Sequence, residues 1–115
     1  METVGRIPFV RLALNHLNLP ARDPESLRQW YVEQLDFEAH GRFLWSAGTL
    51  LVFVDGAPLA RADTHFGFRV DSLAELQTWA SRLGATVEGD EDYSTFFGAD
   101  PEGNRFEIFY EKPHG

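Results

Sequence analysis

The chain has 115 residues and a formal net charge of −8 at neutral pH, and 43% of its residues are hydrophobic. This length suits one domain of ordinary size, and the hydrophobic content is too high for a disordered chain. The acidic balance argues against a nucleic-acid-binding protein, which needs a basic surface facing the phosphates. Because the chain contains no cysteine, disulfides, thiol nucleophiles and Cys-ligated metal sites are excluded.

The sequence predicts neither a membrane anchor nor a secretion signal. Its longest apolar run, Leu50–Val54, is far shorter than the roughly 20 residues that span a bilayer. The first ten residues include charged residues, a glycine and a proline, and they lack the apolar segment of a signal peptide. We therefore expect a cytoplasmic protein with neither a membrane nor a nucleic acid as its partner.

An internal repeat divides the chain into two halves. The segments His16–Leu19 and His65–Phe68 both begin with histidine and carry apolar residues at their second and fourth positions. At the same spacing of 49 residues, a leucine and a tryptophan recur, as the pairs Leu27 with Leu76 and Trp30 with Trp79. A fixed spacing that includes the rare residues His and Trp indicates two copies of one structural unit.

The first half is predicted to contain a strand, a helix and three further strands. Arg11–Leu19 alternates in the manner of a strand. Asp23-Pro24-Glu25 provides a cap, a proline and an early acid, which together favour a helix start. The three short strands expected next are Phe37–His40, Arg42–Ser46 and Thr49–Val54.

The second half repeats this order. Thr64–Val70 is predicted to be a strand, and Asp71 or Ser72 can cap a helix that ends at Leu83, before Gly84. The last three strands are expected at Thr86–Glu88, Tyr93–Gly98 and Arg105–Tyr110. The predicted fold class is therefore α+β: two paired βαβββ modules, at residues 9–56 and 64–111, form a curved mixed-sheet cup with the helices outside.

Alternation along the strands separates an apolar set of side chains from a polar one. The apolar set, expected to face the helices, is Leu17, Leu19, Phe66, Phe68, Val70, Phe106, Ile108 and Tyr110. The other set, expected to line the cup, is His16, Asn18, His65, Gly67, Arg69, Arg105, Glu107 and Phe109. Buried polar groups cost free energy unless they are paired or bound to an ion, so the second set indicates a functional site.

His16, His65 and Glu107 are the candidate metal ligands within this set. Two neutral imidazoles and a carboxylate form a donor set suited to Zn²⁺, Fe²⁺, Mn²⁺ or Ni²⁺. Three protein ligands leave coordination positions open, as in catalytic metal sites. The residues alone also allow a structural alternative, an ion pair between Glu107 and Arg69 or Arg105.

Around these residues the sequence resembles the vicinal oxygen chelate superfamily, which includes glyoxalase I, extradiol dioxygenases, fosfomycin-inactivating thiol transferases and bleomycin-binding proteins. The matching segments are Asn15-His16-Leu17, His65-Phe66 and Asp100-Pro101-Glu102-Gly103-Asn104-Arg105-Phe106-Glu107. The last segment, a DPxGN turn followed three residues later by Glu, is the most specific of them.

The resemblance covers roughly residues 9–111 and implies one glyoxalase/bleomycin resistance/dioxygenase-like domain. It also implies a homodimer and one divalent metal ion held by His16, His65 and Glu107. In glyoxalase I a fourth ligand, a Glu, lies on the last strand of the first module, whereas the matching position here is Val52. The three-ligand pattern is more similar to that of the dioxygenases and the fosfomycin-modifying enzymes, although the latter carry a Thr where Asn18 stands.

The favoured functional prediction is a metal-dependent dioxygenase, lyase or transferase that chelates two adjacent oxygens of a small substrate. Glu107 and Tyr93 are the predicted catalytic residues, and Asn18, Arg69 and Arg105 are predicted to bind the substrate.

Two alternatives belong to other classes. One is a metal-free protein that binds a planar cationic antibiotic, which the negative charge and an aromatic groove would favour. The aromatic residues considered for that groove are Trp45, Tyr93, Phe96 and Phe97. The other is a dimeric scaffold without activity, which would leave the polar set unexplained.

Overall fold

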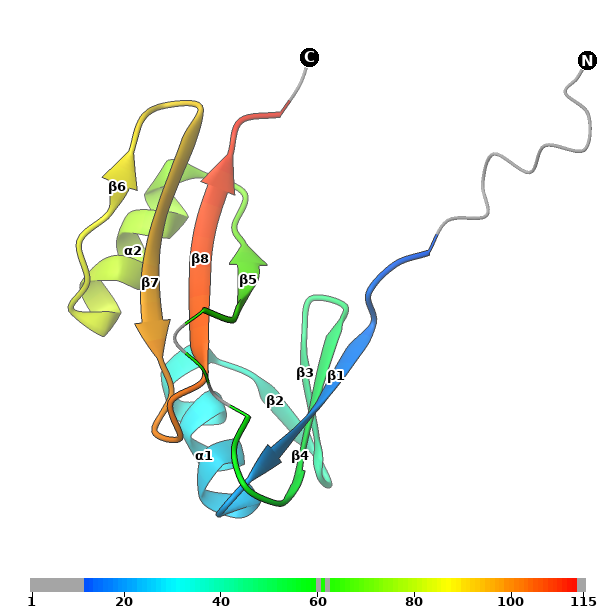
Figure 1. Cartoon of the computed structure of the whole chain (residues 1–115). Helices are drawn as coiled ribbons and strands as arrows, with labels where there is room; N and C mark the ends of the chain where they lie inside the picture. The colour runs from blue at the N-terminus through cyan, green and yellow to red at the C-terminus, as the bar shows by residue number, and fades with distance from the viewer. Residues whose placement is uncertain (1–11, 60, 62, 114–115) are drawn as a thin grey trace, which may run out of the picture.

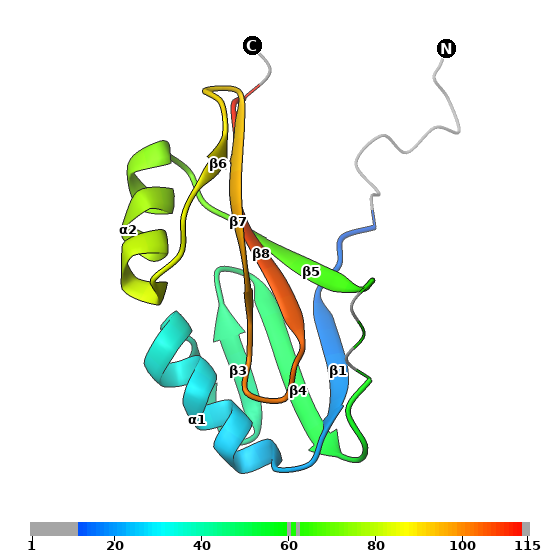
Figure 2. The same ribbon diagram turned by 60° about the vertical axis from the view of Figure 1, so that its left-hand side comes forward.

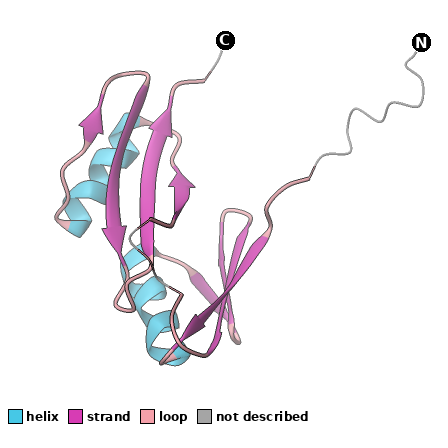
Figure 3. Cartoon of the chain, in the orientation of Figure 1, coloured by secondary structure: helices cyan, strands magenta, loops and turns pink. Residues whose placement is uncertain are grey.

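The computed structural model describes residues 12–59, 61 and 63–113. The first half consists of β1 (His16–Ala21), α1 (Pro24–Leu35), β2 (Glu38–His40), β3 (Phe43–Ser46) and β4 (Thr49–Asp55) (Figure 1). The second half consists of β5 (His65–Arg69), α2 (Leu73–Leu83), β6 (Glu88–Gly89), β7 (Tyr93–Ala99) and β8 (Arg105–Glu111). The predicted α+β class with paired βαβββ units is confirmed, as the colouring by secondary structure makes visible (Figure 3).

The strands form two open four-stranded sheets with the same topology. The strand orders are β1-β4-β3-β2 in the first sheet and β5-β8-β7-β6 in the second. In each sheet the first strand pairs in parallel with the last, and the remaining pairs are antiparallel. Both helices lie along one side of the molecule (Figure 2).

The register of the two parallel pairs reproduces the internal repeat. Asn18 pairs with Val52 in the first sheet, and Gly67 pairs with Glu107 in the second. Asn18 and Gly67 are themselves separated by the 49-residue spacing. Val52 and Glu107 therefore occupy equivalent places in the two sheets.

Both helices start at residues that the sequence indicated. Oδ1 of Asp23 accepts a hydrogen bond from the backbone N–H of Ser26 at 3.1 Å, and Oγ of Ser72 accepts one from the N–H of Glu75 at 3.1 Å. The second helix ends at Gly84, whose φ of 69° lies in the left-handed region that glycine adopts readily. No helix in the described part of the chain is long and apolar enough to cross a membrane.

The ends of the two helices are joined by an ion pair. Arg82 of α2 donates to both carboxylate oxygens of Asp36, each at 2.8 Å, and to the carbonyl of Glu33 at 3.0 Å. These bonds hold the pKa of Asp36 below its usual value. They also stabilise Asp36 at the end of α1, where its φ of 57° is uncommon for a residue with a side chain.

The boundaries of two strands differ from the sequence-based expectation. β1 begins at His16 and not at Arg11, which lies outside the described residues. His16 pairs with Leu50, the second residue of β4, and the carbonyl of Asn15 accepts a hydrogen bond from the N–H of Leu50 at 2.9 Å. The strand expected at Thr86–Glu88 is the two-residue β6.

One hydrophobic core is shared by the two halves. Buried residues from both halves form a single cluster, which includes Leu27, Tyr31, Leu35, Phe53, Leu76, Phe96, Phe106 and Ile108. The ring of Trp30 lies 6.2 Å from that of Phe106, and the ring of Phe37 lies 5.7 Å from that of Phe68. The predicted apolar strand faces pack against this core, so the opposite, polar faces point away from it.

The Asp100–Asn104 turn fastens the second half to the first. The carboxylate of Asp100, which is 5% exposed, accepts hydrogen bonds from the Tyr31 hydroxyl of α1 at 2.7 Å and from the Asn104 side-chain amide at 2.9 Å. It also accepts from the backbone N–H groups of Glu102 and Asn104. Burial and the neighbouring Asp100 raise the pKa of Tyr31 far above its usual value, so Tyr31 remains a hydrogen-bond donor.

Glu102 extends this contact to the start of α1. Its carboxylate accepts hydrogen bonds from the backbone N–H groups of Arg22 at 2.7 Å and Asp23 at 2.9 Å. A carboxylate at a helix N-terminus also interacts favourably with the helix dipole. Glu102 therefore acts as a cap that is supplied by the other half of the chain.

Glu102→Ala is expected to lower the free energy of unfolding by about 1–2 kcal/mol, because two backbone donors lose their acceptor. Urea denaturation followed by circular dichroism measures this change. Glu91→Ala is the matched control, because Glu91 is exposed and makes no hydrogen bond or ion pair with the rest of the described chain. Equal losses in the two variants would contradict a capping role for Glu102.

Candidate metal centre

β5 and β8 bring His65 and Glu107 together on the outer face of the second sheet. Nε2 of His65 lies 3.5 Å from Oε1 of Glu107. The side chain of Glu107 is only 12% exposed, whereas that of His65 is 41% exposed. A largely covered carboxylate is thus placed beside an accessible imidazole.

Two hydroxyl groups from β7 hold the carboxylate of Glu107. Tyr93 and Thr95 both donate to Oε2, at 2.5 and 2.6 Å. Burial raises the pKa of Glu107, but the hydrogen bonds from Thr95 and Tyr93 and the proximity of His65 outweigh burial and lower it overall. Glu107 is therefore ionised at neutral pH, which is the state that binds a cation.

Both the ring and the hydroxyl of Tyr93 are held in place by contacts with β8. Its ring stacks on Phe109, with centroids 5.7 Å apart and an interplanar angle of 21°. Its hydrogen bond to Glu107, together with burial, raises the pKa of Tyr93 to about 12. The hydroxyl consequently stays protonated near neutral pH and donates a hydrogen bond to the carboxylate.

Thr95 was missed by sequence reasoning, although a signal was present. It lies two residues after Tyr93 on a predicted strand, so both side chains must point to the same face. That face became identifiable as the one carrying Glu107 only when the register of β7 against β8 was known.

The pair His65 and Glu107 fits a divalent ion. Two ligands about 2.1 Å from a tetrahedral ion are about 3.4 Å apart, and the observed separation is 3.5 Å. This separation exceeds that of an ordinary N–H···O hydrogen bond. In the described part of the chain no three His, Cys, Asp or Glu residues are grouped closely enough to hold an ion, so this face alone supplies two of the three predicted ligands.

His16 lies on the other sheet, on the outer face of β1. It is exposed, and its Nδ1 is 3.3 Å from Oδ1 of Asn15. A shallow cavity of about 320 Å³ on this face is lined by His16, Asn18, Arg42, Phe43, Leu50, Val52 and Val54. The structure therefore brings His65 and Glu107 together and places His16 on a separate face.

The predicted substrate-binding residues are divided between the same two faces. Asn18 accompanies His16 on the first sheet, whereas Arg69 and Arg105 lie on the strands that carry His65 and Glu107. The guanidinium of Arg105 lies 5.1 Å from the centre of the Phe97 ring, a cation–π contact. One Nη of Arg69 donates to a backbone carbonyl of β8 at 3.3 Å.

Both outer faces expose large hydrophobic side chains. The first sheet exposes Phe43, Trp45 and Val54 by 39–46%, and the second exposes Tyr93 and Phe97 by 40% and 44%. Phe96 was wrongly included among the residues of a possible aromatic groove. It is 3% exposed, because alternation along β7 turns its ring into the core.

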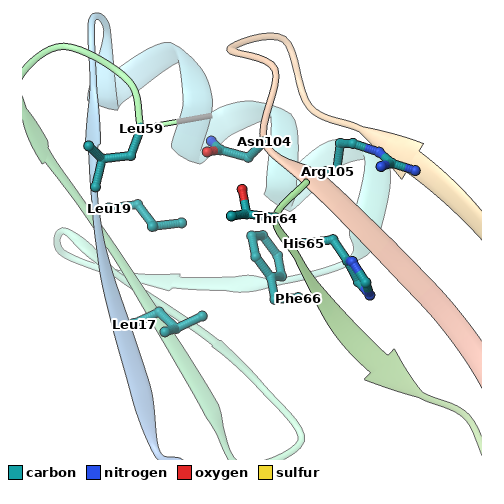
Figure 4. A pocket seen from close by; sticks show the side chains of 8 residues that line it. All are labelled: Leu17, Leu19, Leu59, Thr64, His65, Phe66, Asn104 and Arg105. Carbon is teal, nitrogen blue, oxygen red and sulfur yellow. The ribbon is translucent and has the colours of Figure 1, made fainter. Parts of the chain in front are cut away.

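A pocket of about 280 Å³ lies between β1 and β5, at the seam between the halves. Leu17 and Leu19 point into this pocket toward Phe66, whereas the side chain of His65 points away from it (Figure 4). His16 neighbours Leu17 and so faces away from the pocket as well. The seam between the halves is therefore largely apolar, and His65 is the one candidate ligand among its lining residues, with its side chain turned outward.

Two open sheets of identical topology, each built from a βαβββ unit, define a glyoxalase-like class of fold. The family model for the glyoxalase-like domain matches residues 16–109. The chain belongs to this family and thereby to the vicinal oxygen chelate superfamily.

Solved structures agree with this assignment. A possible glyoxalase from Bacillus cereus is 22% identical over 85% of this chain and 98% of its own, with a TM-score of 0.70. A glyoxalase/bleomycin resistance protein/dioxygenase from Nocardioides is 18% identical over 95% and 89%, with a TM-score of 0.67. Lactoylglutathione lyase from Agrobacterium tumefaciens is 22% identical over 85% and 92%, with a TM-score of 0.63. At these identities the similarity shows the fold, and no curated protein gives a significant match.

Proposed function

We propose that this protein is a metal-dependent enzyme of the glyoxalase/dioxygenase type and that His16, His65 and Glu107 hold one divalent ion. The observation that carries the proposal is the 3.5 Å separation of His65 Nε2 and Glu107 Oε1 on one sheet face. When bound, an ion such as Fe²⁺, Mn²⁺, Zn²⁺ or Ni²⁺ would act as a Lewis acid on two adjacent oxygens of a small substrate.

The chain's own residues would prepare this site in distinct ways. Glu107 is ionised and ready to bind a cation, while Tyr93 keeps its proton and acts as a donor and not as a base. Arg69 and Arg105 would supply local positive charge for an anionic oxygen of the substrate. That charge must act locally, because the net charge of −8 repels anions at long range. Asn18 would offer an amide to the substrate from the other face.

We also propose that the complete site forms between two copies of the chain in a homodimer. The first-sheet face of one protomer, with His16, would meet the second-sheet face of its partner, with His65 and Glu107. Both faces expose large hydrophobic side chains, such as Trp45 and Phe97, which a partner would cover. Two-fold symmetry would then generate two identical sites.

The exposed aromatic rings favour one second candidate, a metal-free protein that binds a planar cation. Trp45, Tyr93 and Phe97 are accessible on the two outer faces, and aromatic faces attract cations. The two candidates differ in whether the His65 and Glu107 side chains bind an ion.

Metal titration separates these candidates. The wild-type protein is expected to bind Zn²⁺ or Mn²⁺ at micromolar concentration, and His65→Ala or Glu107→Ala should weaken binding by more than about 100-fold, because each variant loses a direct ligand. His40→Ala is the control, because His40 is an exposed histidine on β2 that is not one of the proposed ligands and does not line the cavity that contains His16.

If the wild-type protein binds none of Zn²⁺, Mn²⁺, Fe²⁺ and Ni²⁺, the enzyme proposal is wrong. A thermal-shift screen with planar cations then tests the second candidate, because a ligand that binds only the folded state raises the melting temperature.

A further inference from the structure

We propose that Thr95 is a positioning residue that, together with Tyr93, holds Oε2 of Glu107 so that Oε1 alone is presented to the metal. This inference rests on the proposed function and adds a residue outside the predicted ligand set. It assigns a separate role to each carboxylate oxygen of Glu107.

The first observation is that both hydroxyls bond to the same oxygen. Tyr93 donates to Oε2 at 2.5 Å and Thr95 donates to it at 2.6 Å. A carboxylate oxygen offers about two lone-pair directions. Two short hydrogen bonds therefore occupy Oε2 and fix the plane of the carboxylate.

The second observation is that Oε1 remains open on the side of His65. Its neighbour there is Nε2 of His65 at 3.5 Å. Gly67 pairs directly with Glu107, and a Cβ at this position would lie 3.6 Å from Oε1. The absence of a side chain at Gly67 thus leaves space over the oxygen that faces the second ligand.

The third observation concerns how firmly the two donors are held. Thr95 is half-buried and β-branched, so its side chain has few rotamers to lose. Tyr93 is 40% exposed, and stacking on Phe109 restrains its ring. Thr95 is the better covered of the two donors, and we expect its hydroxyl to contribute more to orienting the carboxylate.

Metal affinity in matched Thr95 variants tests this inference. Thr95→Val keeps the shape and removes the hydroxyl, whereas Thr95→Ser keeps the hydroxyl. We expect Thr95→Val to weaken Zn²⁺ binding by about 10-fold or more, because residues that orient metal ligands have effects of 10- to 100-fold on affinity. Thr95→Ser should bind Zn²⁺ almost as tightly as the wild type, because it keeps the hydroxyl. Competition with a fluorescent chelator measures the dissociation constants.

Ser94→Ala is the control on the same strand. Ser94 is buried, and its hydroxyl donates to the backbone carbonyl of Asp90, away from Glu107. Its loss can alter β7 but should leave Zn²⁺ affinity unchanged. The visible spectrum of bound Co²⁺, which depends on the number of ligands, should change in Thr95→Val and stay as in the wild type in Thr95→Ser.

The outcomes separate this inference from the proposed function. If the wild type binds Zn²⁺ and Thr95→Val binds it equally well or more tightly, the positioning role is wrong and the metal site stands. The positioning role is also wrong if Thr95→Ser weakens Zn²⁺ binding as much as Thr95→Val does, or if Ser94→Ala weakens it to the same extent. If the wild type binds none of the divalent ions tested above, both proposals fall.

Discussion

Asp100→Ala is expected to lower the free energy of unfolding by about 3–5 kcal/mol, a large loss for a single polar residue. The variant leaves the fully buried hydroxyl of Tyr31 without its acceptor, and the buried side-chain amide of Asn104 loses its bond as well. It also removes the acceptor for two backbone N–H groups of the turn. Several buried donors thus lose one common partner.

Urea denaturation at a fixed protein concentration measures this effect, since assembly makes stability depend on concentration. Tyr31→Phe removes a single donor and should cost about 1–2 kcal/mol. In the Tyr31→Phe background, Asp100→Ala should cost less than it does alone, because the two side chains share one hydrogen bond. Strictly additive losses would show that the Tyr31–Asp100 bond does not couple the halves.

Co-expression of His16→Ala with Glu107→Ala is expected to restore metal binding that neither variant has alone. In a site shared between protomers, a mixed dimer contains one site with all three ligands and one site that lacks two of them. Random pairing makes about half of the dimers mixed, so about a quarter of the wild-type number of tight sites should return. Metal analysis after gel filtration of the dimer measures this fraction.

The matched control is co-expression of His65→Ala with Glu107→Ala. His65 and Glu107 lie on the same sheet face, so every site in this mixed dimer lacks one of them and no binding should return. Recovery in the control pair, or none in the test pair, would contradict a site formed between protomers. So would a monomeric molar mass from light scattering.

Much of the local structure could be predicted because it depends on neighbours in the sequence. The caps Asp23 and Ser72 each bond to an N–H three residues later, and Gly84 adopts the left-handed conformation that ends a helix. The division of each strand into an apolar and a polar face also follows from alternation. For that reason His65 and Glu107 could be assigned to one face before their separation was known.

What could not be predicted depends on how the halves pack. The bonds from Arg22 and Asp23 to Glu102 join residues about 80 positions apart, and no local pattern encodes them. The same holds for the separation of His16 from Glu107. Alternation assigns each residue to a face, but only the packing of the two halves around the shared core determines where the two outer faces lie in the molecule.

The two sheets differ in charge at one equivalent position. The first sheet has Val52 there, paired with Asn18, whereas the second has Glu107, paired with Gly67. The duplicated units have diverged so that only one of them contributes an anion at this position. A divalent cation in the proposed site would therefore meet one formal negative charge and two neutral imidazoles and keep one positive charge uncompensated. That surplus would favour a substrate that binds as a monoanion through its two oxygens.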